Sequence, residues 1–306
     1  MEYVLTTHRL TKKYGKFKSL DELSLHIPKG AIYGLVGKNG AGKTTLIRLI
    51  CGLQDPTSGD FTLYGVKNSD KAIAKSRRRM GAVVETPAFY SDMTAKENLK
   101  MQYAMLGLPS YDGIDELLSL VQLSDTGRKK AANFSLGMKQ RLGIALALCG
   151  NPDFLVLDEP INGLDPQGII EIRELILRLN RERNITVLIS SHILEELAKL
   201  ATHYGFIDSG NIVQEISAEE LEARCRKYLH VKVISTAILA QVMDRLGAAY
   251  EIISETEANV YGTFRISQLV ADLSAANCEL LSVTEHEESL ENYFINLVGN
   301  AGGERV

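Results

Sequence analysis

The sequence predicts an α/β fold, and two observations support this prediction. Short apolar runs typical of buried parallel strands alternate with amphipathic segments of helical period. A glycine-rich loop at 37–44 stands between one apolar run, 31–36, and a helical pattern at 44–51. A strand, a glycine loop and a helix in that order form the usual framework for binding phosphate groups at the edge of a parallel sheet.

Two strands are predicted before this framework, and a mostly helical insertion is predicted after it. Residues 2–10 and 20–27 have strand patterns and are separated by a turn at Gly15 and Lys16. Residues 87–133 change character and show helical rather than strand patterns. A further helix is expected over 136–149, so we expect a helical subdomain over about 87–150.

The next segment carries the strongest strand and helix patterns. Residues 154–157 are wholly apolar and 185–189 nearly so, as in central parallel strands. Between them, 167–180 has apolar residues at helical spacing. A helix follows His192, and a hairpin is expected over 204–215. This alternation predicts the parallel core of the fold.

A small, separate α/β unit is predicted over 226–306, after a first domain at 1–222. No catalytic constellation is visible in this second unit, so we expect it to be regulatory or to support dimerisation. Its predicted strands lie at 229–234, 248–253, 259–265 and 278–284, and its predicted helices near 236–246, 267–275 and 287–298.

Length and composition limit the possible functions. The 306 residues correspond to about two domains. The 34 basic and 38 acidic residues give a net charge of −4, which argues against a nucleic-acid-binding protein. The four cysteines form no Cys-x-x-Cys pair, as expected for thiols in a reducing compartment. No apolar stretch approaches the roughly 20 residues that span a bilayer, so we expect no transmembrane segment.

Residues 37–44 read Gly-Lys-Asn-Gly-Ala-Gly-Lys-Thr and fit the phosphate-loop pattern, with a strand before it and a helix after it. Glycines let the backbone N–H groups turn toward phosphate oxygens, and the helix N-terminus adds partial positive charge. Lys43 would place its charge on the β- and γ-phosphates, and the Thr44 hydroxyl is a hard oxygen ligand for Mg²⁺. We expect nucleotide binding by Gly37, Lys38, Asn39, Gly40, Ala41, Gly42, Lys43, Thr44 and Thr45.

A second candidate site lies where the run 154–157 ends in Asp158 and Glu159. Ligands of open α/β sheets bind at the carboxyl ends of parallel strands. We expect Asp158 to hold Mg²⁺ and Glu159 to polarise the attacking water. The alternative, two ordinary surface acids, is disfavoured by the phosphate loop in the same chain.

These and further motifs resemble, in their order, the nucleotide-binding subunits of ATP-binding-cassette (ABC) transporters over roughly residues 3–222. Residues 135–141, Ser-Leu-Gly-Met-Lys-Gln-Arg, are similar to the family signature, with Leu136 where a first glycine is usual. Residues 161–166 resemble the loop after the catalytic glutamate. His192 resembles the switch histidine, and Tyr14 the aromatic residue that stacks on adenine.

The resemblance implies a P-loop NTPase cassette whose core sheet carries an antiparallel β subdomain and a helical subdomain. Two copies would face each other head to tail and enclose ATP and Mg²⁺, and a separate membrane permease would be driven by hydrolysis. We therefore expect the chain at the cytoplasmic face of the membrane, attached through that permease. The resemblance implies Glu159, His192 and Lys43 as catalytic residues, and Ser135, Gly137 and Gln140 as contacts to the nucleotide of the opposite copy.

Glu85 departs from most of the family, which has a glutamine at this position, between the Mg²⁺ site and the groove for the membrane partner. A carboxylate can still ligate Mg²⁺, but it adds negative charge near Asp158 and Glu159. With the Ser-Leu-Gly-Met-Lys-Gln signature, this segment resembles the subgroup of bacitracin-resistance and lantibiotic self-protection exporters. The substrate implied is an antimicrobial peptide or antibiotic.

Other functions remain open at this point. Sodium or drug exporters share much of the same pattern. A soluble ABC ATPase acting on ribosomes or DNA is disfavoured by the acidic charge and the single cassette. A generic P-loop switch is disfavoured by the signature and by His192.

Overall fold

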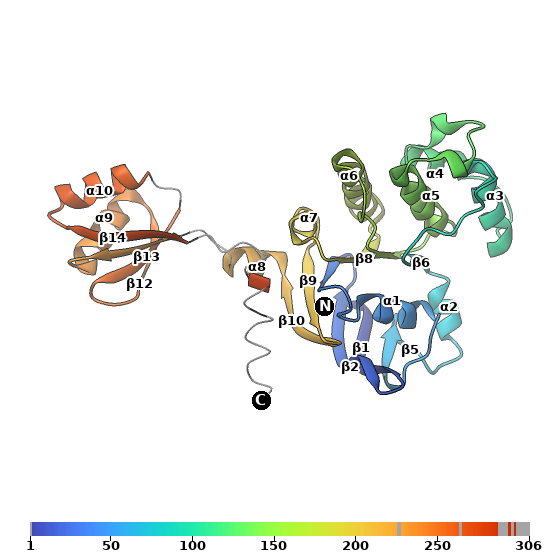
Figure 1. The fold of residues 1–306 in the computed structure, drawn as a ribbon, viewed down its shortest axis with the longest axis horizontal. Coiled ribbons are helices and arrows are strands. Elements are labelled where there is room, and N and C mark those ends of the chain that lie inside the picture. Colours follow the sequence, from blue (N-terminus) through green and yellow to red (C-terminus); the bar gives the residue numbers. More distant parts are fainter. Residues whose placement is uncertain (1, 225–227, 263–264, 287–292, 295–296, 298–306) are drawn as a thin grey trace. The chain divides into compact units, whose positions relative to one another are not determined.

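The computed structural model describes residues 2–224, 228–262, 265–286, 293–294 and 297. The chain divides into two compact units, Met1–Ala218 and Glu219–Val306. The first unit contains a six-stranded sheet and a four-stranded antiparallel sheet, and the second contains a four-stranded sheet of its own. The predicted α/β fold class is therefore confirmed (Figure 1).

The six-stranded sheet forms the centre of the first unit. Strands β3, β8, β7 and β6 pair in parallel, β9 is parallel to β3, and β10 is antiparallel to β9. The middle strands are buried along their whole length, which is why their sequences are almost continuous apolar runs. In spatial order the strands are β10 (Asn211–Ser217), β9 (His203–Asp208), β3 (Ile32–Val36), β8 (Thr186–Ser191), β7 (Phe154–Asp158) and β6 (Met80–Val83).

Helix α1 (Lys43–Cys51) is buried between the two sheets of the first unit (Figure 1). Its apolar side chains share one core with Phe61 of the antiparallel sheet and with Phe154 and Val156 of β7. Side chains alternate across a strand, so these two β7 residues and Asp158 lie on the α1 face. Helix α6 (Pro166–Arg183) covers the opposite face (Figure 1). The sheet therefore directs Asp158 toward the phosphate-loop helix.

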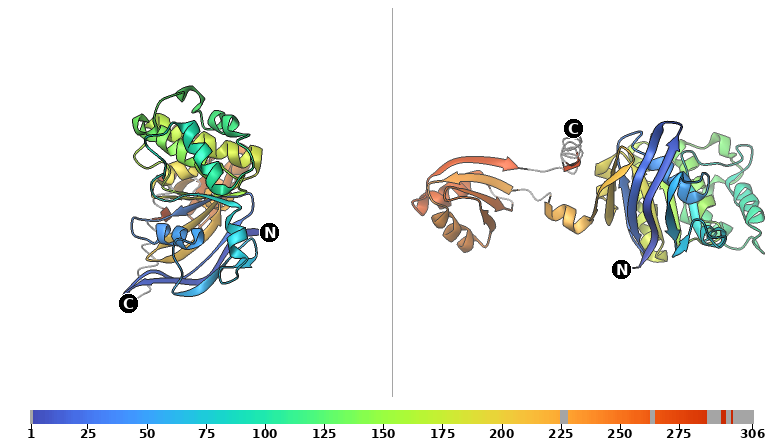
Figure 2. Two further views of the ribbon diagram at one scale, coloured as in Figure 1. Left: turned by 90° about the vertical axis from the view of Figure 1, so that its right-hand side faces the viewer. Right: turned by 90° about the horizontal axis from the view of Figure 1, so that it is seen from below.

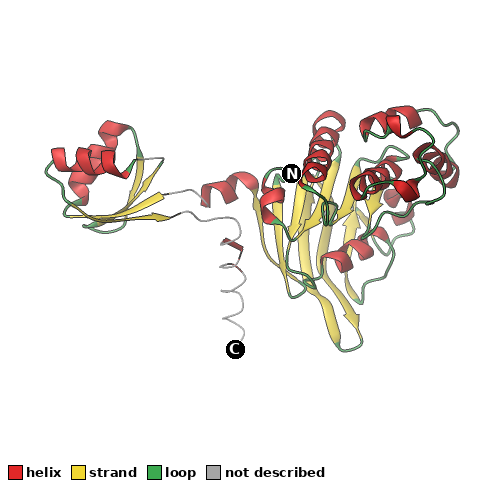
Figure 3. Cartoon of the chain, turned by 45° about the horizontal axis from the view of Figure 1, so that its top comes forward, coloured by secondary structure: helices red, strands yellow, loops and turns green. Residues whose placement is uncertain are grey.

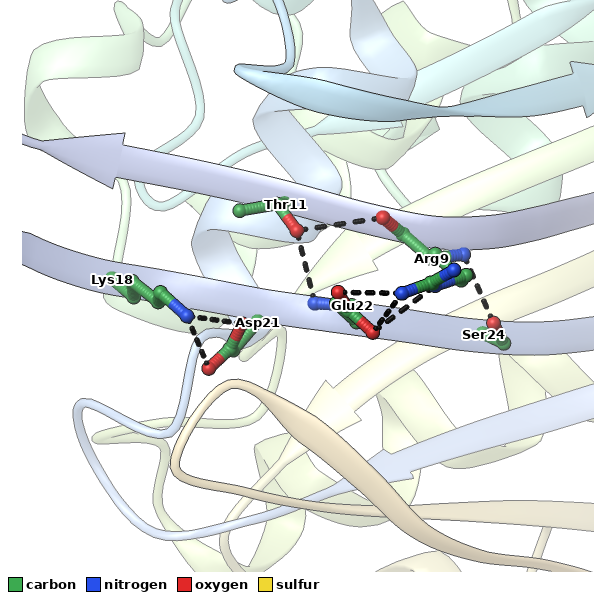
Figure 4. A network of polar contacts seen from close by, with 6 residues as sticks. All are labelled: Arg9, Thr11, Lys18, Asp21, Glu22 and Ser24. Carbon is green, nitrogen blue, oxygen red and sulfur yellow. Dashed lines mark hydrogen bonds and ion pairs between the residues drawn. The ribbon is translucent and has the colours of Figure 1, made fainter.

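The antiparallel sheet contains an irregular pairing that its side chains complete. Near Arg9 the register of β1 and β2 shifts, and Arg9 and Glu22 have left-handed φ angles of 47° and 53°. Arg9 pairs with Glu22 at 2.8 Å, while Thr11 and Ser24 hydroxyls each accept a backbone N–H at 3.0 Å (Figure 4). These side chains thus satisfy backbone N–H groups that the shifted ladder leaves without a partner on the neighbouring strand. The sheet order is β2 (Phe17–Pro28), β1 (Tyr3–Tyr14), β4 (Ser58–Leu63) and β5 (Val66–Lys67).

Helices α3, α4 and α5 gather at one end of the first unit, away from the antiparallel sheet (Figure 2). A capping box begins α3: the Thr94 hydroxyl accepts the Glu97 N–H at 3.2 Å, and the Glu97 carboxylate accepts the Thr94 N–H at 2.7 Å. This cap explains why the helix starts at Ala95.

Two arginines bind the end of α4. Arg178 of α6 donates to the Leu120 carbonyl, and Arg141 of α5 donates to the Gln122 carbonyl at 3.4 Å. Carbonyls at a helix end lack helical partners, so these bonds tie α4 to its neighbours. The remaining helical elements are α2 (Ile73–Arg77), α3 (Ala95–Leu106), α4 (Ile114–Leu120), η1 (Ser124–Thr126), η2 (Ala131–Asn133), α5 (Leu136–Leu148) and α7 (Leu194–Ala198).

The second unit is a β-α-β-β-α-β arrangement, the split βαβ motif. Its strands pair antiparallel in the order β12-β13-β11-β14, and both helices lie on one face of the sheet (Figure 3). The helix predicted near 287–298 falls largely outside the described residues. The elements are β11 (Tyr228–Val233), α9 (Thr236–Leu246), β12 (Ala249–Ile252), β13 (Glu257–Tyr261), α10 (Ile266–Ala275) and β14 (Leu280–His286), preceded by α8 (Ala218–Arg224).

Close packing of β6 against α5 can be tested with one methyl group. A Cβ at Gly81 would overlap the backbone carbonyl of Ala147, whereas a Cβ at Gly34 of β3 would meet side chains at an ordinary 3.4 Å. Gly81→Ala should therefore cost about 1–3 kcal/mol of stability. We expect a lower Tm for Gly81→Ala and little change for Gly34→Ala in thermal denaturation. Equal Tm values would show that α5 does not approach β6 this closely.

Candidate nucleotide-binding site

The phosphate loop joins β3 to α1 in a conformation that requires glycine. Gly40 and Gly42 have φ angles of 83° and 111°. A Cβ at Gly42 would lie 2.7 Å from the Ser19 carbonyl oxygen, and one at Gly37 would lie 2.5 Å from that of Ile207. The backbone can curl here because these positions have no side chain. The result is a loop of N–H groups at the N-terminus of a buried helix, an arrangement suited to phosphate.

The remaining loop residues differ in exposure. Lys38, Asn39 and Gly40 are exposed, and Ala41 is buried. Thr44 is half-buried at the start of α1. The Thr45 hydroxyl is buried and lies 2.7 Å from the Ser19 hydroxyl of β2, so this side chain anchors α1 to the antiparallel sheet. Any contact of Thr45 with a nucleotide would have to use its backbone.

Lys43 connects the loop to the acidic strand end. Its side chain is only 6% exposed. The ammonium group donates to the Gly37 carbonyl at 2.6 Å and lies 3.2 Å from one carboxylate oxygen of Glu159. A buried charge needs such partners. The contact brings the phosphate-loop cation and the candidate base to the same place.

Glu159 lies between Lys43 and His192. Its second carboxylate oxygen is 2.8 Å from Nδ1 of His192. Glu159 itself has a left-handed φ of 49°, which turns the chain sharply after β7. Strained positions of this kind collect at functional sites. A carboxylate held between a cation and an imidazole is well placed to accept a proton beside a bound phosphate.

Asp158 ends β7 and is 1% exposed. One carboxylate oxygen accepts a hydrogen bond from the Ser190 hydroxyl at 2.6 Å. The other, Oδ2, is buried and has no hydrogen-bond partner among the described residues. Hard carboxylate and hydroxyl oxygens are the ligands that Mg²⁺ prefers, so Asp158 and Thr44 fit this ion. Sequence reasoning missed Ser190, although parallel strand register places it directly opposite Asp158.

Tyr14 and the signature residues lie elsewhere in the first unit. Tyr14 ends β1, is 43% exposed, and donates its hydroxyl hydrogen to Gln54. Ser135 is the N-cap of α5 and accepts the Met138 N–H at 3.3 Å; Gly137 is half-buried and Gln140 is buried. In the described part of the chain, neither Tyr14 nor Ser135 has a hydrogen bond with Lys43, Glu159 or His192.

Glu85 pairs with Arg48 of α1 through a short contact between carboxylate and guanidinium. The backbone of Glu85 is left-handed, with a φ of 60°. Its neighbours Val84 and Thr86 line a groove of about 810 Å³, whose other walls come from α2, α3 and α5. Glu85 thus stands between the phosphate-loop helix and this groove. On the groove wall, Met105 is 69% exposed.

Cys51 lies at the end of α1 and is not a candidate nucleophile. Burial raises the pKa of its thiol, the nearby charge of Arg77 lowers it by a smaller amount and that of Asp158 raises it slightly, so that the pKa is about 12. The reactive thiolate is therefore absent at neutral pH.

Known proteins resemble this chain along its whole length. The profile of the family described as ABC transporter matches residues 20–162. The bacitracin transport ATP-binding protein BcrA of Bacillus licheniformis is 43% identical over 302 residues, with 98% of each chain covered. The lantibiotic transport ATP-binding protein SrtF of Streptococcus pyogenes is 43% identical over 212 residues, covering 69% of this chain and 90% of SrtF.

A solved structure agrees with these sequence relatives. A dimeric ATP-binding cassette in a post-hydrolysis state, bound to ADP and Pi, has a TM-score of 0.63 and 25% identity, covering 70% of this chain and 98% of that one. The phosphate loop, the acidic strand end and these similarities agree. The chain belongs to the ATP-binding proteins of ABC transporters.

Proposed function

We propose that this protein hydrolyses ATP to drive the export of an antimicrobial peptide or related antibiotic through a separate permease. The observation that carries the ATPase proposal is the Glu159 carboxylate, held between Lys43 and His192 beside Asp158. The export proposal is supported by the full-length similarity to a bacitracin transport protein and by the shorter similarity to a lantibiotic transport protein.

In the proposed reaction each site residue has a separate task. The loop N–H groups and Lys43 bind the β- and γ-phosphates. Thr44 and Asp158 would hold Mg²⁺, which would supply positive charge to the phosphates. Glu159 orients the attacking water and accepts its proton, while His192 keeps the Glu159 carboxylate in place and faces the γ-phosphate. Tyr14 stacks on the adenine.

We propose that a second copy completes the site. Ser135 is exposed at the N-terminus of α5, and in the described chain its hydroxyl has no hydrogen bond to the phosphate loop, which supports binding of the opposite copy's nucleotide by Ser135. Gly137 and Gln140 are proposed to take part with it, although Gln140 is buried in this structure. A cassette with a similar fold is known as a dimer with ADP and Pi.

The permease is proposed to dock in the groove beside Glu85. This groove has a mixed lining, in which apolar side chains such as the exposed Met105 stand beside the basic Arg77 and Arg78, and its rim continues into the segment that carries Glu85. Among the described residues no helix is long and apolar enough to cross a membrane. We therefore propose that the chain reaches the cytoplasmic face of the membrane through its permease.

The proposed domains follow the two compact units. Residues 1–222 would form the cassette, with a helical subdomain at about 87–150, and 226–306 an accessory domain. The 302-residue similarity to BcrA extends over both units, whereas the similarity to SrtF spans 212 residues. The accessory domain would thus be shared with some relatives, the bacitracin transport proteins among them, rather than be a requirement for ATP hydrolysis.

Replacing the proposed base tests the reaction. Glu159→Gln removes the proton acceptor but keeps the side-chain size, so ATP turnover should fall about 10²–10⁴-fold. Binding of ATP should persist, because the phosphate loop is unchanged, and the variant should accumulate as an ATP-bound dimer in size-exclusion chromatography. Glu182→Gln, an exposed change on α6, serves as the control. Wild-type turnover by Glu159→Gln would remove Glu159 from the mechanism.

Glu85 can be tested against a matched ion pair. Glu85→Gln removes one negative charge near the metal site and releases Arg48, so hydrolysis should need several-fold more Mg²⁺, since an amide oxygen is a weaker ligand. Glu116→Gln breaks a comparable exposed pair with Arg183, remote from the phosphate loop. It should leave the Mg²⁺ titration unchanged. Identical titrations for both variants would refute a role of Glu85 at the metal.

A further inference from the structure

The Ser190 hydroxyl bonds to both site carboxylate residues, Asp158 and Glu159. Ser190 belongs to β8 and is fully buried. Parallel pairing of β7 and β8 sets it opposite Asp158. Its hydroxyl donates to Oδ1 of Asp158 at 2.6 Å and accepts the backbone N–H of Glu159 at 2.9 Å.

The Ser190 hydroxyl can form both hydrogen bonds at the same time. A serine hydroxyl has one hydrogen to donate and two lone pairs to accept. The hydrogen goes to the carboxylate of Asp158, and a lone pair receives the Glu159 N–H. The bond to Asp158 is buried and the bond to the Glu159 N–H is partly buried, so an unpaired polar group would be costly here.

Each bond limits the orientation of one carboxylate. With Oδ1 of Asp158 occupied by Ser190, Oδ2 is left as the oxygen available to a metal ion. At Glu159, the bonded N–H holds the left-handed turn, and the turn carries the side chain to Lys43 and His192. One hydroxyl therefore fixes the orientation of the candidate metal ligand, Asp158, relative to that of the candidate base, Glu159.

We propose that Ser190 is a positioning residue for ATP hydrolysis, coupling the orientation of Asp158 toward Mg²⁺ to that of Glu159 toward water. The inference rests on the proposed ATPase function. The neighbouring Ser191 differs, because its hydroxyl accepts the Ile193 N–H at 2.9 Å and shapes the next turn.

The test compares three substitutions in the full-length protein. Ser190→Ala deletes both bonds, whereas Ser190→Thr keeps a hydroxyl, and Ser190→Cys fits the same space with a weaker donor. Thr186→Val is the control, since it deletes another buried β8 hydroxyl, one that accepts the Gly30 N–H at 2.8 Å far from the carboxylates. Thermal denaturation shows which variants fold.

The main measurement is the affinity for a fluorescent ATP analogue as Mg²⁺ is titrated, followed by steady-state hydrolysis. Ser190→Ala should need about 10–100-fold more Mg²⁺ and should lose a similar factor in kcat, as outer partners of metal ligands usually do. Affinity measured without Mg²⁺ should not change. Ser190→Thr should restore most of the Mg²⁺ response, with Ser190→Cys intermediate, and Thr186→Val should match the wild type.

A Mg²⁺ titration of folded Ser190→Ala within twofold of the wild type would overturn the inference, and so would a shift of the same size in Thr186→Val. The proposed function fails separately, if the wild type hydrolyses no ATP. In that case the titration of analogue binding still decides whether Ser190 orients the metal ligand.

Discussion

The proposed site depends on the parallel pairing of β3, β7 and β8. Parallel strands end at the same edge of a sheet, so one edge receives the phosphate loop after β3, the two carboxylates at the end of β7 and His192 after β8. No single loop holds these groups together. Burial of α1 between two sheets then fixes the helix N-terminus, and with it Lys43, against that edge.

Much of this arrangement could be predicted from residue patterns. Strands buried on both faces need continuous apolar runs, so β3, β7 and β8 could be recognised in the sequence. The phosphate loop was recognisable because its geometry permits few residue types, as the crowding at Gly37 and Gly42 shows. The predicted roles of Lys43, Glu159 and His192 rest on motifs, and the structure adds the contacts among them.

Other features depend on pairings between distant segments and could not be predicted. Ser190 matters because of the residue opposite it in β7, and register is not visible in either strand alone. The pair between Arg48 and Glu85 joins two elements 37 residues apart. The N-terminal strands extend beyond their patterns, because pairs such as Lys13–Lys18 and Tyr14–Phe17 continue the ladder as far as the turn between the two strands.

The carboxylates of the site differ in whether a positively charged side chain already pairs with them. Glu159 has Lys43 and His192, Glu85 has Arg48, and Asp158 has only the Ser190 hydroxyl, with Oδ2 left without a partner in the described chain. An arriving cation is attracted most simply to Asp158, since no existing ion pair must be broken there. Glu85 could leave Arg48 to join the metal. Because Glu85 lies beside the groove, that exchange would couple the nucleotide to the surface on which the permease is proposed to dock.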